Sequence, residues 1–391
     1  MKRRLTNYLL AVREMLPEAI SSKLRAKRFR YRLKDVTPVP RSDGERPSLY
    51  IAPANFAGQG FQWTRAVKNT LGIGAANLTI PRGKTRFSSD FMVSHTVAVA
   101  STRWQRQHFD NVASGFSHVL IEACTPLFGS LFGGDVKREV AALQERGVTV
   151  GMISHGSEVR RPSGHLARHP FSMFEAMPPE RVASMERVAV KNQQLIKELG
   201  LPWFVSTAGL LVDHPQASWL PVCIEVERWT TSRVVLSADI PVVVHAPSRE
   251  AVKRSDLIDG ALADLDARGV IHYRRIAGIP NSEMPGFLAD ADVLVDSVGS
   301  GNYGVAACEG MAAGLVVVAT IDPAIRSLVR RETGFELPIV DTPPDAVAET
   351  IVNVVRDRDK SRAVAAAGFE FVTALHDGRR SAEALREFLD S

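Results

Sequence analysis

The stretch that decides the fold runs from Ala291 to Thr320 and reads ADVLVDSVGSGNYGVAACEGMAAGLVVVAT. Its apolar run at 293–295 predicts a buried strand, which a glycine-rich loop follows. A short helix of small residues around Glu309 and a second apolar strand over 316–319 come next. This order predicts one β-loop-α-β unit of a parallel sheet. The loop holds three glycines: Gly299, Gly301 and Gly304.

The loop and helix have the features of a ligand site. Glycines allow a backbone to approach a ligand closely, and a helix start offers unpaired N–H groups and the positive end of a dipole to a phosphate. Glu309 lies on a helix whose other side chains are Ala, Gly, Cys and Met. We therefore interpret the Glu309 carboxylate as an acceptor for hydroxyl groups of a ligand.

Two other interpretations of the loop stay open. The glycines also spell G-x-G-x-x-G, and Asp322 lies where a ribose-binding acid of a dinucleotide fold could stand. Such a fingerprint normally opens the first unit of its domain, whereas two strand candidates, PVVVH and GVIHY, precede this loop. The position therefore argues against a nicotinamide or flavin site. The loop could also be a purely structural turn.

The rest of the chain repeats the alternation of strands and helices. Helical patterns over 135–147, 186–200 and 249–269 separate apolar runs, which indicates parallel sheets with both faces covered. Ligands of such sheets gather beyond the carboxyl ends of the strands. Strands are predicted at 48–54, 77–81, 95–100, 118–123, 148–154, 241–248 and 269–278, a strand with a turn over 201–212, and a last edge strand before Pro338.

The segment GNYGVAACEGMAAGLVVVA resembles the nucleotide-sugar signature of the retaining GT-B glycosyltransferases, family 4 or group 1, written Glu-x7-Glu. The resemblance implies an α/β fold of two doubly wound Rossmann-like domains facing a central cleft. It also implies transfer of a sugar from a nucleotide-diphosphate donor, with retention of configuration. Glu309 matches the second Glu, which holds the ribose. Gly301 stands where the family has its first Glu, near the donor sugar.

Further site residues are implied by the same resemblance. Lys253 and Arg249 match the cations that clamp the diphosphate, although Arg249 stands one place too close, and either could be surface charge. His155, directly after an apolar run, matches the His presented to the donor sugar and is the catalytic candidate; it could also merely cap a strand. The remaining candidates are the donor-loop residues Gly301, Asn302, Tyr303 and Gly304, and Gly58 and Gly60 in a phosphate or acceptor loop.

The predicted domain organisation follows from these patterns. Residues 1–46 are a basic N-terminal arm and linker, and residues 47–222 are an acceptor-side Rossmann-like domain. Residues 223–365 are the nucleotide-sugar-binding domain. Residues 366–391 are a helical segment that packs back on the first domain.

Composition and charge limit the classes of partner that this chain can have. The chain has 391 residues, of which 45% are hydrophobic, and a net charge of +5, with basic residues crowded into residues 2–34. That basic, partly apolar arm is either a segment for an anionic membrane surface or a solvated arm. No nucleic-acid motif accompanies it. Three cysteines lack metal-ligand spacing, and no apolar stretch is long enough to span a membrane. We expect a cytoplasmic protein that is either free or peripheral to the inner face of the membrane.

Three functions remain after this reading. The first is a glycosyltransferase that needs no metal, uses a UDP-, GDP-, ADP- or dTDP-sugar and acts on a lipid-linked, polysaccharide or small-molecule acceptor. The second is a catalytically weak GT-B nucleotide-binding or scaffold protein, which Gly301 in place of Glu favours. The third is an NAD(P)-dependent enzyme.

His165 and His169 are four residues apart and could bind a metal ion from one face of a helix. This is a weak candidate, because Pro162 and Pro170 disfavour a long helix there.

Overall fold

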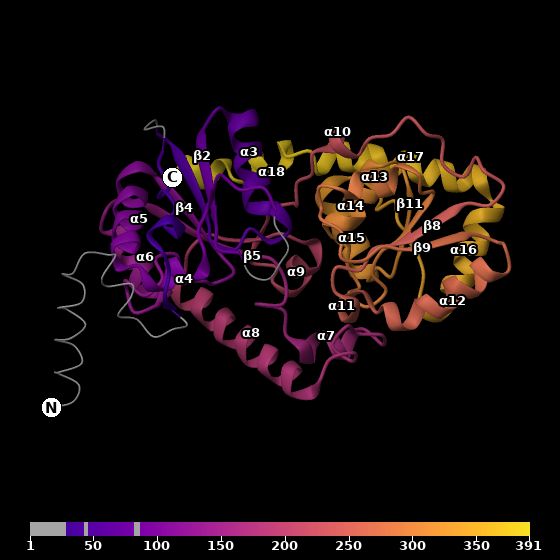
Figure 1. The fold of residues 1–391 in the computed structure, drawn as a ribbon, viewed down its shortest axis with the longest axis horizontal. Helices are drawn as coiled ribbons and strands as arrows, with labels where there is room; N and C mark the ends of the chain where they lie inside the picture. Colours follow the sequence, from indigo (N-terminus) through magenta and orange to yellow (C-terminus); the bar gives the residue numbers. More distant parts are fainter. Residues whose placement is uncertain (1–28, 43–45, 82–86) are drawn as a thin grey trace. The chain divides into compact units, whose positions relative to one another are not determined.

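The computed structural model describes residues 29–42, 46–81 and 87–391, so most of the basic arm lies outside the described residues. Two sheets organise this part of the chain (Figure 1). The strands of the first sheet are β1 (Ser48–Ala52), β2 (Gly74–Thr79), β3 (Phe91–Met92), β4 (His118–Glu122), β5 (Thr149–Ser154), β6 (Trp203–Val205) and β7 (Ser218–Trp219). Those of the second are β8 (Val242–His245), β9 (His272–Arg275), β10 (Val293–Val295), β11 (Val316–Ala319) and β12 (Val340–Asp341).

Helices connect the strands. In the first half they are α3 (Gln59–Leu71), α4 (His95–Ala100), α5 (Thr102–Gly115), α6 (Val136–Gln144), α7 (Pro162–Arg168), α8 (Pro179–Leu199) and α9 (Ala208–Asp213). In the second half they are α10 (Val226–Trp229), α11 (Glu250–Lys253), α12 (Ser255–Ala267), α13 (Met284–Ala289), α14 (Val305–Ala312), α15 (Pro323–Thr333), α16 (Val347–Arg356), α17 (Arg358–Leu375), α18 (Arg379–Ala384) and α19 (Arg386–Leu389).

The predicted fold class of two Rossmann-like sheets is confirmed. The strand orders are β3-β2-β1-β4-β5-β6-β7 and β12-β11-β10-β8-β9, and β10 pairs with β8 and β11 in parallel. Figure 1 shows α12 and α16 on one side of the second sheet and α14 and α15 on the other. The residues of β8, β10 and β11 are all buried, as expected for parallel strands covered on both faces.

The contacts of the chain define two compact units. The first comprises the described residues up to 153, together with 195–203 and 385–391. The second comprises 154–194 and 204–384. The segment 154–194 therefore belongs to the same unit as the second sheet. The domain boundaries proposed from the sequence, after 46, 222 and 365, stay predictions.

Three predicted elements differ in the structure. Residues 95–100, predicted as a strand, form helix α4, because the Ser94 side chain accepts a hydrogen bond from the N–H of Val97 and so caps a helix start. In the run 201–212, a short strand is followed by helix α9 rather than by a turn. The edge strand predicted before Pro338 lies further along the chain, as β12.

The last residues of the chain complete the core of the first unit. The Phe388 ring meets the His118 ring edge to face, with 5.1 Å between the centroids. A Cβ added to Gly151, in β5, would lie 3.1 Å from the Phe388 ring. Phe388 is therefore seated where β5 has no side chain, and α19 belongs to the packing of β4 and β5.

A second glycine of this unit lies close to backbone. Gly129 has a φ of +61°, and a Cβ there would lie 2.1 Å from the carbonyl oxygen of Ala98 in α4. The Gln105 side chain donates to the same oxygen at 2.7 Å. Gly147 has a φ of +76° with nothing within 4 Å of an added Cβ. Gly129 and Gly147 therefore share a left-handed backbone conformation and differ only in the room available to an added Cβ atom.

We predict that Gly147→Ala lowers the free energy of unfolding by about 1 kcal/mol, the usual cost of a left-handed non-glycine residue. Gly129→Ala should cost at least about 2 kcal/mol more, because the methyl group must also displace backbone. Urea unfolding of the two variants measures the difference. Equal losses would show that the Ala98 carbonyl does not constrain this loop.

Candidate functional site

An ion pair joins the loop after β10 to helix α11, which follows β8. Lys253 contacts Asp296, whose side chain is almost fully buried. Two more bonds reinforce the junction, from the Ser297 hydroxyl to the Val252 carbonyl and from the Val298 N–H to the Lys253 carbonyl. Strands β8 and β10 are neighbours, so both elements start at the same edge of the sheet.

Glu309 is the second charged group of this region, on helix α14. The Asn281 side-chain amide donates to its Oε1 at 3.1 Å. Burial raises the pKa of the Glu309 carboxyl to about 7, and the Asn281 bond and the charge of Arg228 act in the opposite direction. Asp296 and Lys253 also act on this pKa, so the predicted pair Glu309 and Lys253 is brought into one electrostatic neighbourhood.

Arg228 and Asn281 were not found from the sequence. The Arg228 guanidinium donates to the Asn281 carbonyl at 2.8 Å and lies over the Trp229 ring. Both residues come from irregular segments, since α10 is one helical turn and Asn281 lies just before α13. Asp296 was also missed, although its place directly after the apolar run 293–295 is the usual signal of a strand-end carboxylate.

Gly301 keeps a space that a histidine ring fills. Its φ is +61°, and an added Cβ would lie 2.5 Å from Cε1 of His169. The Gly301 carbonyl accepts the N–H of Asp322 at 2.8 Å, and the Asp322 carboxylate lies 3.6 Å from Nε2 of His169. The structure therefore gives a physical reason for glycine at this position, because any side chain would clash with His169.

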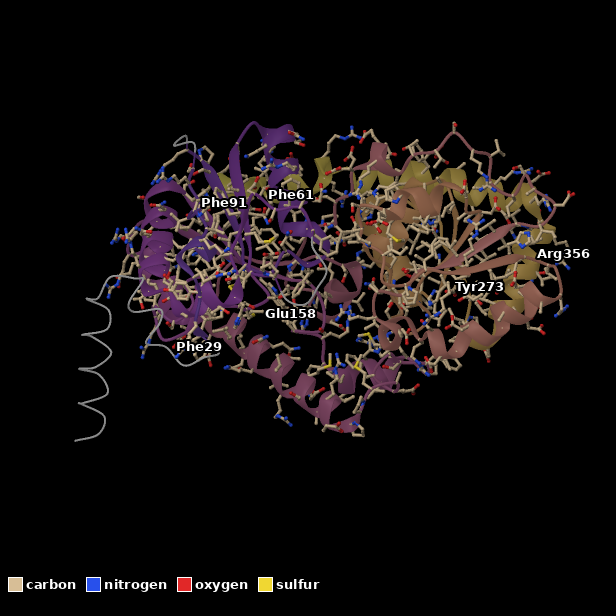
Figure 2. The ribbon with its side chains drawn as sticks, viewed as in Figure 1. Phe29, Phe61, Phe91, Glu158, Tyr273 and Arg356 are labelled. Carbon is tan, nitrogen blue, oxygen red and sulfur yellow. The ribbon has the colours of Figure 1, made fainter. Side chains whose placement is uncertain are left out.

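His155 lies directly after β5, as predicted, and is half-buried. Its N–H and that of Gly156 donate to the carboxylate of Glu158, one of the side chains labelled in Figure 2. This fixes the turn that carries the imidazole. Contact of His155 with a sugar stays a prediction.

The other donor-loop candidates lie in different environments. Tyr303 is buried, with its hydroxyl 3.4 Å from Nε2 of His376 and its ring against Phe371, so we expect any ligand contact to come from its backbone. Gly304 immediately precedes α14 in extended backbone. Arg249 is exposed at the start of α11.

The loop of Gly58 and Gly60 lies in the first unit. Its amides at Ala54 and Asn55 donate to the buried carboxylate of Glu122 at 2.7–3.0 Å. A Cβ on Gly60 would lie 3.2 Å from that carboxylate. Gly60 therefore lets the loop close on Glu122, whereas Gly58, with a φ of +76°, lies against Phe87. A contact of either glycine with a phosphate or acceptor stays a prediction.

The pair His165 and His169 was considered for metal binding. Nδ1 of His165 lies 2.7 Å from the Ser172 hydroxyl, and Nε2 lies 3.2 Å from the Ser300 carbonyl. Both ring nitrogens of His165 are therefore engaged within the protein. In the described part of the chain no group of three or more His, Cys, Asp or Glu side chains could hold a metal ion. Nor does any helix there combine the length and apolar character that a membrane crossing requires.

Comparisons with known proteins agree with this geometry. Residues 237–357 match the family model described as glycosyl transferases group 1. They include β8, Lys253, the glycine-rich loop and Glu309. No curated protein matches the sequence.

Solved structures share the fold over most of the chain. A sucrose-phosphate synthase from Thermosynechococcus elongatus matches with a TM-score of 0.58 at 13% identity, covering 88% of this chain and 98% of that one. HepE from Anabaena, solved with UDP and glucose, matches with 0.54 at 12%, covering 88% and 99%. A glycosyltransferase from Rickettsia africae matches with 0.51 at 11%, covering 88% and 97%. At these identities the likeness shows the GT-B fold.

We predict that Lys253→Met lowers the free energy of unfolding by about 3 kcal/mol, because it leaves the Asp296 carboxylate buried without its partner. The double variant Lys253→Met/Asp296→Leu should lose less than the single one. Arg268→Met, which breaks an exposed pair with Asp264, is the matched control and should change stability little. Urea unfolding tests all three. A double variant as unstable as Lys253→Met would show that the pair is not the cause.

Proposed function

We propose that this chain, whose residues 237–357 match the family model of the group 1 glycosyl transferases, transfers a sugar from a nucleotide-diphosphate donor to an acceptor with retention. The bond from the anomeric carbon to the diphosphate oxygen breaks, and the acceptor oxygen bonds to that carbon and releases its proton. The observation that carries the proposal is the joint placement of Glu309 and Lys253 around one loop. A carboxylate that accepts hydrogen bonds from hydroxyl groups, together with a cation that acts on it electrostatically, suits a nucleoside diphosphate.

Each site residue receives a role. The Glu309 carboxylate accepts hydrogen bonds from the ribose hydroxyls, beside the amide of Asn281. Lys253, with Arg249 just before the start of the same helix, neutralises the leaving diphosphate, and the N–H groups after Gly304 at the start of α14 add to this. His155 contacts the sugar as it develops positive charge. Residues 301–303 line the donor through their backbone.

The donor and acceptor classes are proposed from the ligands of a structural neighbour and from the sequence, and not from the geometry of the site. HepE is solved with UDP, with UDP and glucose, and with UDP-glucose, so uridine compounds are the first donors to test. No metal is needed if Lys253 carries the neutralisation. A lipid-linked acceptor and a peripheral membrane location rest on the basic residues 2–34, most of which are outside the described residues.

A weakly catalytic binding protein is the second candidate function. It is favoured by Gly301, whose neighbour His169 occupies the space that a carboxylate side chain would need. This candidate predicts binding of a nucleoside diphosphate without sugar transfer. Turnover assays with the nucleotide identified below separate the two functions.

We predict that one nucleoside diphosphate among UDP, GDP, ADP and dTDP raises the melting temperature of the full chain. Glu309→Gln should weaken its affinity 10-fold to about 100-fold, since a hydrogen bond to a charged acceptor is worth about 1.5–3 kcal/mol. Glu370→Gln on α17, an exposed carboxylate, is the control and should bind as the wild type does. Unchanged affinity in Glu309→Gln would remove the ribose assignment, and stabilisation by NAD(P) alone would overturn the family function.

The pH dependence follows from the raised pKa of Glu309. Because that pKa is about 7, the carboxylate is ionised above pH 7 and becomes protonated as the pH falls below it. Nucleotide affinity should therefore fall by up to about tenfold per unit below pH 7. Glu309→Gln serves as the reference, because ionisation of the nucleotide phosphate near pH 6 affects both proteins alike. Parallel profiles of the two proteins between pH 8 and 6 would contradict the assignment.

A further inference from the structure

A buried histidine at the end of β8 joins the two segments that carry the ion pair of Lys253 and Asp296. The His245 side chain is fully buried. Its Nδ1 lies 2.8 Å from the carbonyl oxygen of Val295, the last residue of β10. Its Nε2 lies 2.8 Å from the hydroxyl of Ser255, the first residue of α12. Val295 immediately precedes Asp296 in the chain, and Ser255 comes two residues after Lys253.

These two hydrogen bonds determine which ring nitrogen of His245 carries the proton. A carbonyl oxygen only accepts, so Nδ1 is protonated and donates to Val295. In the neutral ring Nε2 is then an acceptor, and the Ser255 hydroxyl donates to it. Burial lowers the pKa of the His245 imidazole, and the positive charge of Lys253 acts in the same direction, so the ring is neutral at pH 7.

The serine–histidine contact has the form of a nucleophile with its base, but burial excludes that role. Ser255 is 2% exposed and His245 is 0% exposed, so a substrate does not reach the hydroxyl. The two side chains therefore act on the parts of the protein that they connect.

The backbone between Lys253 and Ser255 adopts a strained conformation. Arg254 separates α11 from α12 and has a φ of +55°, in the left-handed region that non-glycine residues rarely adopt. Such strain persists only where the surrounding structure holds the residue in place. The Arg254 guanidinium donates to the Ser172 carbonyl at 3.1 Å, which holds the side chain. The bond from Ser255 to His245 holds the backbone that follows it.

We propose that His245 is a positioning residue of the nucleotide site, which acts through Ser255 to keep the Lys253 ammonium group where the diphosphate binds. Without the bond to His245, the turn at Arg254 relaxes and displaces the lysine that precedes it. Because His245 is buried, it acts on the ligand through Lys253. The inference rests on the proposed function, since it concerns the cation that was assigned to the diphosphate there.

The test separates the diphosphate from the rest of the nucleotide. The full chain is titrated with the nucleoside diphosphate that the melting-temperature screen selects and with the free nucleoside of the same base, by calorimetry and by competition in ligand-observed NMR. We expect Ser255→Ala to weaken diphosphate binding at least about fivefold, because the ammonium group is misplaced, while nucleoside affinity changes less than about twofold. His245→Asn, which keeps an N–H for the Val295 carbonyl and loses the acceptor for Ser255, should have the same effect.

Two controls make the effect specific to Lys253. Ser361→Ala removes another buried serine hydroxyl, which donates to the Val354 carbonyl at 2.9 Å, and should change neither affinity. In the background of Lys253→Met, Ser255→Ala should weaken diphosphate binding less than about twofold, because the group that it misplaces is no longer there. Urea unfolding first establishes that each variant is folded in the assay, and His245→Asn takes the place of Ser255→Ala if the latter is not.

The outcomes separate the inference from the function on which it rests. Diphosphate affinity that Ser255→Ala and His245→Asn leave unchanged would overturn the positioning role and leave the glycosyltransferase proposal intact. Equal losses for nucleoside and diphosphate would show a general disturbance of the site and overturn it as well. So would a full loss on top of Lys253→Met, because Ser255 would then act by another route. If no nucleoside diphosphate binds at all, the proposed function fails first, and the inference fails with it.

Discussion

The absence of a side chain at Gly301 is the constraint on which the site depends. It lets the His169 ring lie against the loop, and neighbouring bonds hold the rest of that segment there. Nε2 of His165 lies 3.2 Å from the Ser300 carbonyl, and the N–H of Met173 donates to the Gly299 carbonyl at 2.8 Å. A segment that leaves the first sheet at residue 154 is thereby built into the unit of the second sheet. The glycine-rich loop is consequently held by contacts with residues 165–173, and it begins next to the buried pair of Lys253 and Asp296.

Much of the fold, and less of the site, could be predicted from the sequence. The unit around Glu309 was predictable because its strands are continuous apolar runs and its helix consists of small residues, so periodicity and composition agree. The run 95–100 was not, because alternating Val and Ala suit a strand or a helix and the capping serine before it decides. Lys253 and Glu309 were found through resemblance to a family motif. Arg228 and Asn281 reach Glu309 through three-dimensional proximity between irregular segments, which leaves no local pattern to detect.

The carboxylates of Glu122, Glu139 and Glu309 differ in what their oxygens contact; the first two are fully buried, and Glu309 is half-buried. Glu122 accepts backbone N–H groups of the loop after β1, and Glu139 accepts those of Leu127 and Phe128 at 2.7 and 3.0 Å. In both carboxylates the two oxygens accept hydrogen bonds from backbone N–H groups, so these side chains have a structural role. Glu309 receives, among the described residues, one side-chain bond from Asn281. The Glu309 oxygens can therefore accept further hydrogen bonds from a ligand, although burial raises the pKa of this carboxyl to about 7. An underused acceptor on a rigid helix is what separates a ligand-binding carboxylate from a structural one.

The packing of Phe388 on the first sheet affects how the protein must be made. Residues 385–391 belong to the first unit, although residues 204–384 before them all belong to the second. During synthesis the strands of the first sheet leave the ribosome long before the residue that fills the space above Gly151. Until then, the face of the sheet above Gly151 and His118 stays open to water or to chaperones. A ribosome that stalls in α17 or α18 would therefore release a chain whose early half is incomplete, even though every strand of its sheet has already been translated.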